Sequence, residues 1–281
     1  MSLVIVIGAG LECCIHQSRE QRLAVQAIRS RGGTIYYDDY DAVWPRRLPD
    51  GKSWCPVWLQ QLLGDDDFFH HVVVVDLDVE KSGHRARTTD ADLVHLEGLR
   101  HVKILWLGGG RITDAGLEHL KNLTDLQMLG LRGNPISGAG LKHLRGLRKL
   151  RFLDLSQTAV TDDQLTYLKD LTGLETIDLE NNPQLTGSFL QHVADLPNLK
   201  TLDLRGSGIT DSALVHLKRA KNVQSLMLGR TRVTDAGLPY LRGLTSLRSL
   251  DLSQTAVTDV DIARTEAWFP QASVKPPVPE K

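Results

Sequence analysis

Roughly two thirds of the chain repeats one leucine pattern every 24 residues. The seven apolar positions between Leu99 and Leu120 return as apolar positions between Leu123 and Leu144. Later units begin at Leu147, Leu171, Leu196, Ala220 and Leu244. A degenerate unit that begins near residue 72 precedes these, which makes eight units. Because one short unit cannot bury its own leucines, consecutive units are expected to stack into a solenoid with one continuous core.

Each unit changes its hydrophobic period halfway along. Leu153 and Leu155 alternate with Asp154, which is typical of a strand with one buried face. A segment of the form Val-Thr-Asp-Ala-Gly-Leu-x-x-Leu then follows with helical spacing. The units therefore predict an α/β fold, with parallel strands on a concave face and helices on a convex face. A threonine stands where the N-cap of such a helix is expected, at Thr113, Thr161, Thr210, Thr234 and Thr258.

The consensus LxxLxLxx(T/N)x(V/I)TDAGLxxL resembles the leucine-rich repeat of the ribonuclease-inhibitor-like type. It is similar to bacterial GALA-like repeats and to the repeat half of F-box proteins, and it spans about residues 72–262. The resemblance implies a right-handed horseshoe that binds another protein. Some bacterial relatives carry a membrane anchor before a helix and a Gly-Gly-strand segment, and the apolar start of this chain resembles the tail of such an anchor.

Aromatic residues mark a boundary near residue 70, because eight of the fifteen lie between positions 34 and 69. Before it, Ser18 to Arg31 is expected to form a helix, followed by a strand over 34–37 and a second helix over 57–63. We expect this region to cap the solenoid and its strand to lie beside the first repeat strand. The domains are predicted as an apolar segment 1–16, a cap 17–70, a leucine-rich repeat domain 71–270 and a Pro-rich flexible tail 271–281. Trp268 and Phe269 are expected to cover the C-terminal core.

The N-terminal apolar run admits two interpretations. It is shorter than the about 18 to 20 residues of a spanning helix and lacks the basic start of a secretory signal, but it resembles the remnant of an anchor. Alternatively, Gly8 and Gly10 begin a dinucleotide-binding fingerprint with Asp38 as its acid, although the third glycine is missing. Membrane association, a cytoplasmic location, and an enzyme or nucleotide-binding unit within residues 1–70 therefore remain alternatives.

Composition narrows the possible partners. A net charge of −1 offers no electrostatic argument for nucleic acid. Cys13, Cys14 and Cys55 lack the spacing of a zinc site and leave the repeats unlinked, so we predict free thiols, no disulfide and no metal. The repeats supply no recognisable catalytic set, and we expect a non-enzymatic protein without a cofactor.

Two columns of polar residues recur along the repeats. Histidine occupies one helical position in several units and is expected to pack between helices rather than to bind metal, at His95, His119, His143, His192 and His216. Aspartate recurs on the concave face, at Asp76, Asp154, Asp178, Asp203 and Asp251. Basic residues near it in register are expected to balance its charge, at Lys103, Arg151, Lys200, Arg205 and Arg248. Ligand contact and metal binding remain the alternatives for this column.

The strand position between the first two buried leucines points to a partner site. It reads Val74, Ile104, Met128 and Phe152, and then Thr176, Thr201, Ser225 and Ser249. With Trp106, the first four form what we call the apolar stripe. Large exposed apolar patches usually mark contact sites, so the stripe, flanked by Arg132, Arg151 and Asp154, is the predicted partner-binding face. The alternative is that the N-terminal region folds over the stripe and buries it.

Overall fold

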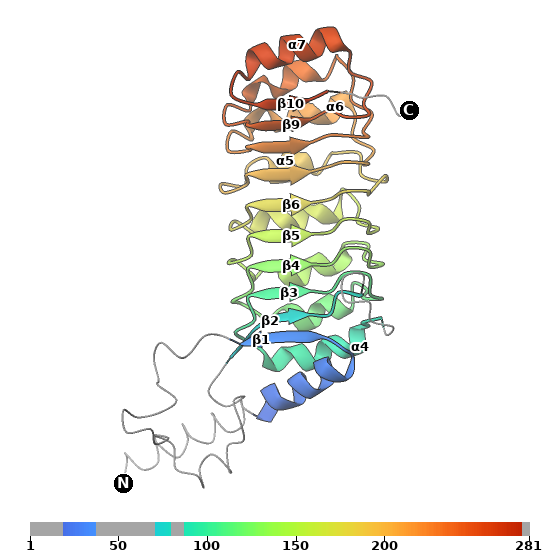
Figure 1. The fold of residues 1–281 in the computed structure, drawn as a ribbon, viewed down its shortest axis with the longest axis vertical. Helices are drawn as coiled ribbons and strands as arrows, with labels where there is room; N and C mark the ends of the chain where they lie inside the picture. Colours follow the sequence, from blue (N-terminus) through green and yellow to red (C-terminus); the bar gives the residue numbers. More distant parts are fainter. Residues whose placement is uncertain (1–18, 38–70, 80–86, 277–281) are drawn as a thin grey trace, which may run out of the picture.

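One sheet of ten short strands runs along the long axis of the molecule (Figure 1). The computed structural model describes residues 19–37, 71–79 and 87–276. Each strand pairs with its neighbour in sequence, and every pairing from β2 to β10 is parallel. The strands are β1 (Thr34–Tyr37), β2 (Val72–Asp76), β3 (Ile104–Trp106), β4 (Met128–Gly130), β5 (Phe152–Asp154), β6 (Thr176–Asp178), β7 (Thr201–Asp203), β8 (Ser225–Met227), β9 (Ser249–Asp251) and β10 (Ser273–Lys275). The eight predicted repeats supply β2 to β9, so the predicted solenoid is confirmed.

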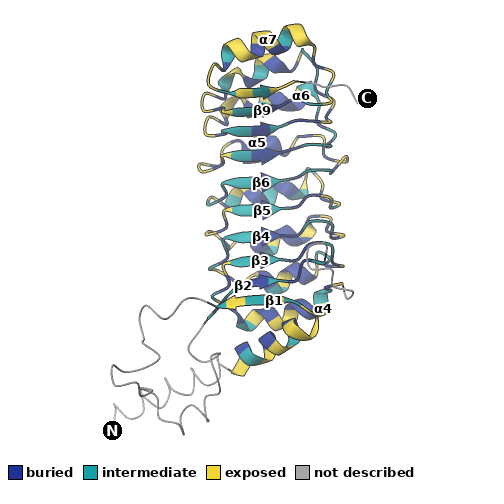
Figure 2. Cartoon of the chain, in the orientation of Figure 1, coloured by how far each residue is buried: buried dark blue, intermediate teal, exposed yellow. Residues whose placement is uncertain are grey.

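The convex side consists mainly of single helical turns. Most are 3₁₀ helices of five to seven residues, a form that proteins use in short pieces and as connectors. They are α4 (Asp90–Leu93), η3 (Val94–Gly98), η4 (Gly116–Leu120), η5 (Ala139–Leu144), η6 (Gln164–Asp170), α5 (Leu190–Val193), α6 (Asp211–Leu214), η7 (Val215–Arg219), η8 (Leu238–Gly243) and α7 (Asp259–Trp268). The leucine core lies between these turns and the sheet (Figure 2).

Three of the threonines predicted as N-caps, Thr113, Thr234 and Thr258, also bind an aspartate of the preceding repeat. Thr113 donates its backbone N–H and its hydroxyl to the Asp90 carboxylate, at 2.8 and 2.6 Å. Thr234 makes the same pair of bonds to Asp211, at 2.8 and 2.7 Å. These aspartates therefore join consecutive repeats. Each hydroxyl also accepts the N–H two residues further on, from Ala115 and from Ala236, both at 3.3 Å, so the capping prediction is confirmed at Thr113 and Thr234. Thr210 and Thr258 stand at the N-cap of their helices, but their hydroxyls make no capping bond.

An N-terminal helix over residues 19–30 and strand β1 lie against the first repeat. Ala24, Val25 and Ile28 face the core, with exposures of 3% or less. Arg31 extends this contact, since its Nη2 lies 2.8 Å from the Asp92 carboxylate. Strand β1 pairs with β2 in antiparallel register, which confirms the predicted position of this strand. The predicted segment 1–16, the cysteines and the helix over 57–63 lie outside the described residues.

The C-terminal end departs from the predicted flexible tail. Ser273–Lys275 form β10, so the prediction of a tail from residue 271 was wrong for these residues. The edge of β9 offers unpaired backbone groups, and the Ser273 N–H donates to Arg248 O at 2.8 Å. Phe269 is only 7% exposed after α7, and the Arg242 guanidinium stacks on the Trp268 ring at 4.1 Å. Residues 277–281 lie outside the described part.

Candidate functional site

The strand register aligns the predicted partner-binding residues in one row. Val74 pairs with Ile104, and the row continues through Met128 to Phe152. These four side chains are half-buried, whereas Leu105, the residue after Ile104 on β3, is fully buried in the core. The same row continues on β6 to β9 as Thr176, Thr201, Ser225 and Ser249. The predicted change from apolar to hydroxyl side chains thus falls between β5 and β6.

The structure adds Tyr36 to the end of this row. Tyr36 of β1 lies opposite Val74 and is 58% exposed. Directly opposed residues of antiparallel strands point to the same face of a sheet, so the phenol lies next to the apolar stripe. The repeat pattern could not reveal this residue, because β1 lies outside the repeats and its register is set by a single strand pairing.

A second concave row lies two residues further along each strand and contains Asp76, Trp106, Gly130 and Asp154. The ring of Trp106 crosses from this row to the first. It lies over Gly130 of β4, where a Cβ would overlap Cε3 and Cζ3 of the indole. The ring meets Phe152 edge-on, with 5.7 Å between centroids and 68° between planes. Such edge-to-face pairs are favourable beyond the area that they bury. Gly130 is therefore part of the site, and the sequence signal for it was a glycine at the strand position where the neighbouring repeats have Trp106 and Asp154.

The aspartate column lies in the second row, as predicted by the repeat. Asp154 pairs in register with Asp178, and Asp178 pairs with Asp203. Each carboxylate accepts the backbone N–H two residues further on, at 2.9 Å from Ser156, 2.9 Å from Glu180 and 3.1 Å from Arg205. This bond fixes the chain as it leaves the strand, which gives the column a structural role.

The basic residues balance this column only in part. Arg205 binds Asp203, with its Nε 3.0 Å from both carboxylate oxygens. Arg151 and Lys200 pair with Glu175 instead, at 3.5 and 2.6 Å. The prediction that they balance the column was wrong, because Glu175 stands between them at the start of β6 and is nearer than the aspartates at the strand ends.

The negative charge that the basic residues leave unbalanced affects the pKa of Asp178. Burial raises the pKa of Asp178 to about 6, and the neighbouring charges of Asp154, Asp203 and Glu180 act in the same direction. The backbone hydrogen bond from Glu180 opposes this rise without cancelling it. The centre of the concave face is thus crowded with negative charge.

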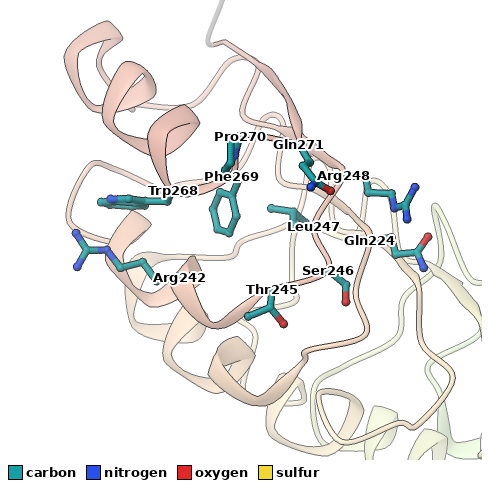
Figure 3. Close-up of a pocket in the computed structure, with 10 residues that line it drawn as sticks. All are labelled: Gln224, Arg242, Thr245, Ser246, Leu247, Arg248, Trp268, Phe269, Pro270 and Gln271. Carbon is teal, nitrogen blue, oxygen red and sulfur yellow. The ribbon is translucent and has the colours of Figure 1, made fainter.

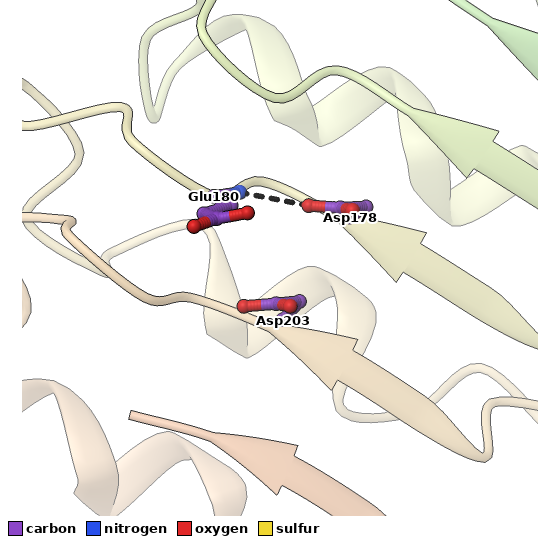
Figure 4. A group of neighbouring side chains, drawn as sticks. All are labelled: Asp178, Glu180 and Asp203. Atoms are coloured by element: carbon purple, nitrogen blue, oxygen red, sulfur yellow. Dashed lines mark hydrogen bonds between the residues drawn. The ribbon is translucent and has the colours of Figure 1, made fainter. Parts of the chain in front are cut away.

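Three of these acids lie close enough to share a cation. Oxygens of Asp178, Glu180 and Asp203 fall within 4.8 Å of one another (Figure 4). Guanidinium groups already occupy two of them, because Arg205 binds Asp203 and Glu180, and Arg230 Nη2 lies 2.7 Å from Glu180 Oε1. The group fits a charge-balanced network better than a metal site. Among the described residues, no three histidines of the helical column lie close enough to share a metal ion.

Arg132 and Arg151 flank the apolar stripe at opposite ends of the strands. Arg151 directly precedes β5 and is exposed, whereas Arg132 follows β4 and is half-buried. Asp154 lies on the side of Arg132, at the end of β5. All eight predicted partner-binding residues thus lie on strands β2 to β5 or within two residues of their ends. The alternative, that the N-terminal region covers the stripe, depends on residues 1–18 and 38–70, which lie outside the described part.

A separate hollow of about 480 Å³ lies at the C-terminal end of the solenoid (Figure 3). Arg242, Trp268, Phe269 and Arg248 are among the residues that line it. It forms where α7 ends and the chain turns into β10. Its walls are mainly polar, and Arg242 is engaged by Trp268, so this hollow is a weaker candidate site than the concave face.

Comparison with known proteins identifies the repeat. Two family models described as leucine rich repeat match residues 100–160 and 195–217. These parts of the chain are leucine-rich repeats, and the solenoid has the leucine-rich repeat fold. No curated protein shows significant similarity to its sequence.

Two solved structures from Listeria monocytogenes show the same fold as this chain. Internalin C2 is 25% identical, with a TM-score of 0.58, and the match covers 73% of this chain and 80% of that one. Internalin F is 22% identical, with a TM-score of 0.52, and the match covers 69% of this chain and 59% of that one. Within the described residues, no helix is long and apolar enough to cross a membrane.

Proposed function

We propose that this protein is a non-catalytic scaffold that binds another protein on the concave face of β2 to β5. The observation that carries this proposal is the apolar stripe. Its side chains point away from the leucine core. On β6 to β9, the same row holds only threonine and serine. The fold therefore tolerates hydroxyl side chains in this row, and core packing does not require apolar ones.

The size of the stripe suits a protein partner. Val74, Ile104, Met128 and Phe152 lie on four adjacent strands, which span roughly 15 Å at about 4.8 Å per strand. Trp106 adds an indole, the kind of side chain found most often at the energetic centre of interfaces. A few apolar side chains of a partner can therefore be buried here at once.

The proposal is tested by capture with matched variants of the full chain. Met128→Lys combined with Phe152→Lys introduces two charges into the stripe, and Ser225→Lys combined with Ser249→Lys introduces two charges into the same row on β8 and β9. Cell lysate is passed over each immobilised protein, and thermal unfolding confirms that each variant is folded. We expect a protein that the wild type retains to be captured equally by the serine variant. The captured amount should fall at least tenfold with the stripe variant.

Two results would contradict this function. Equal capture by both variants would move the binding site away from the stripe. A rise in the unfolding midpoint on adding NAD or ATP would favour the alternative of a nucleotide-binding unit in residues 1–70.

A further inference from the structure

We propose that the partner inserts a lysine or arginine side chain between Asp154 and Asp178 while its apolar side chains cover Met128 and Phe152. This inference rests on the proposed function, because it names the chemistry of the segment that the same concave face receives. The expected ligand is a peptide segment of another protein that carries both basic and apolar side chains.

The apolar stripe ends where the two carboxylates begin. Phe152 and Asp154 lie two residues apart on β5, so both side chains point to the concave face. Asp178 stands beside Asp154 in register on β6. Two residues of strand span about 7 Å, a distance that a lysine or arginine side chain covers. An apolar anchor and a cation one to three residues apart in a partner would therefore reach both features.

Most other acids on this face already have a basic partner. Arg205 binds Asp203, Arg230 binds Glu180, and Lys275 lies 3.4 Å from Asp251. Glu175 is held between Arg151 and Lys200. The surrounding charge is thus largely balanced by residues of the chain itself.

Within the described residues, no basic side chain makes a hydrogen bond or an ion pair with Asp154 or Asp178, although Arg205, which is bound to Asp203, is near enough to interact with the charge of Asp178. Asp154 Oδ1 accepts both the N–H and the hydroxyl of Ser156, and Asp178 Oδ1 accepts the N–H of Glu180. The Oδ2 atom of each carboxylate has no hydrogen bond among the described residues. Two half-buried negative charges therefore stand side by side with one acceptor oxygen each still available, next to an apolar surface.

A cation between the two carboxylates would offset the unfavourable electrostatic energy that they have in the free protein. The raised pKa of Asp178 shows that its ionised form is disfavoured by burial and by its neighbours. A guanidinium or ammonium group favours the ionised form of both carboxylates, and the apolar contact with Phe152 keeps water from screening the pair. Charge complementarity therefore selects a basic segment over a neutral or acidic one.

Selection from a random peptide library displayed on phage tests this inference without a known partner. The full chain is immobilised as wild type, as Asp154→Asn with Asp178→Asn, and as Phe152→Ser. Asparagine retains the carbonyl oxygen that accepts the Ser156 and Glu180 N–H bonds, so the double variant is expected to fold. Asp163→Asn, at an exposed residue before η6, is the matched control.

We expect wild type and control to enrich peptides in which lysine or arginine lies within three positions of tryptophan, phenylalanine, leucine or methionine. The affinity of one such synthetic peptide, measured by calorimetry, should fall at least tenfold for the double asparagine variant and for Phe152→Ser. It should remain unchanged for the control and weaken as salt is raised from 50 to 500 mM, about the range in which screening shortens from beyond 10 Å to a few Å.

The possible failures are distinguishable. The selected peptides could bind Phe152→Ser more weakly yet show no preference for basic residues, or could bind the double asparagine variant as tightly as the wild type. Either result would overturn the proposed insertion of a cation and leave the proposed function standing. A selection that yields no peptide weakened by Phe152→Ser overturns the proposed function and this inference together.

Discussion

The indole ring of Trp106 occupies the space that a side chain at Gly130 would fill. The ring crosses the neighbouring strand and reaches Phe152 on the strand beyond, where the two aromatic groups meet edge-on. A residue of the second row thereby completes the apolar row beside it. The shape of the apolar stripe depends on a residue that has no side chain.

Gly130→Ala should therefore disturb the stripe without removing any of its side chains. The new Cβ overlaps Cε3 of Trp106, so the ring must move, and overpacking of this kind costs about 1 to 3 kcal/mol of unfolding free energy. We expect urea unfolding to show this loss and the affinity for a stripe-binding peptide to fall. Gly146→Ala is the control, because a Cβ there meets nothing within 4 Å. Equal effects at both glycines would argue against the observed position of the indole.

The contact between Trp106 and Phe152 can be measured directly. Trp106→Ala, Phe152→Ala and the double variant form a cycle in which the coupling energy isolates the pair. Edge-to-face aromatic pairs contribute about 0.5 to 1.5 kcal/mol, and we expect a coupling in this range by urea unfolding. Trp106→Ala combined with Ser249→Ala, which lies on β9, should show additive effects. A coupling near zero between the two aromatic residues would mean that the rings do not touch in solution.

The sequence predicted the rows of the concave face because two periodicities determine them. The alternation within each strand assigns Ile104 outward and Leu105 inward, and the 24-residue repeat places Met128 beside Ile104. The solenoid and its eight repeat strands, β2 to β9, follow from these patterns alone.

Features set by single contacts could not be predicted in this way. Tyr36 depends on the register of one antiparallel pairing, and β10 depends on the free edge of β9. The bonds from Thr113 to Asp90 join residues 23 apart, and in the sequence each residue looks like part of its own helix start. Arg151 pairs with Glu175 and not with the aspartates, because ion pairing depends on the distances between side chains, which the repeat does not specify.

Asp114 offers a test of the bonds that join repeats. Its carboxylate accepts the N–H groups of Ser137, Gly138 and Gly140 and the Ser137 hydroxyl, at 2.6 to 3.0 Å. Burial raises the pKa of Asp114, but these hydrogen bonds outweigh it and the pKa lies below 3.8. Asp114→Ala leaves several donors unpaired, and we expect a loss of about 2 kcal/mol at pH 7.

The effect of Asp114→Ala should also depend on pH. Since the folded-state pKa is lowered, the stabilisation is present above pH 3.8 and is lost as the pH falls through the folded-state value. Asp163→Ala is the control, because that exposed side chain makes no hydrogen bond within the described residues, and its effect should stay within about 0.5 kcal/mol. A similar loss for both variants in urea unfolding would mean that Asp114 does not join the repeats.

Asp178→Asn should stabilise the protein at neutral pH. The folded-state pKa of about 6 exceeds the ordinary value of 3.8, so the ionised carboxylate destabilises the folded state above pH 6 and has no such effect below pH 3.8. The difference corresponds to about 3 kcal/mol, and screening by solvent lowers the expected gain to about 1 to 2 kcal/mol.

Urea unfolding of Asp178→Asn at pH 7.5 and at pH 4.0 measures this difference. The free energy of unfolding of the variant should exceed that of the wild type at pH 7.5 and approach it at pH 4.0. Asp163→Asn should match the wild type at both. A gain of equal size at the two pH values would show that repulsion at Asp178 is not its source.

The N-terminal helix and β1 are expected to act as the cap of the solenoid. Ile28 is 3% exposed, and its side chain lies next to Gly33 together with that of Leu77 from the first repeat. Ile28→Ala removes these contacts, and a buried isoleucine truncated to alanine typically costs about 2 to 5 kcal/mol. Because each repeat is stabilised by its neighbours, we expect the unfolding of the whole repeat domain to shift as one transition. Leu23→Ala on the same helix is the control, since Leu23 is 58% exposed. If Ile28→Ala instead produced a separate early transition and left the midpoint of the repeats unchanged, the helix would be an appendage, and the first repeat would be stable without a cap.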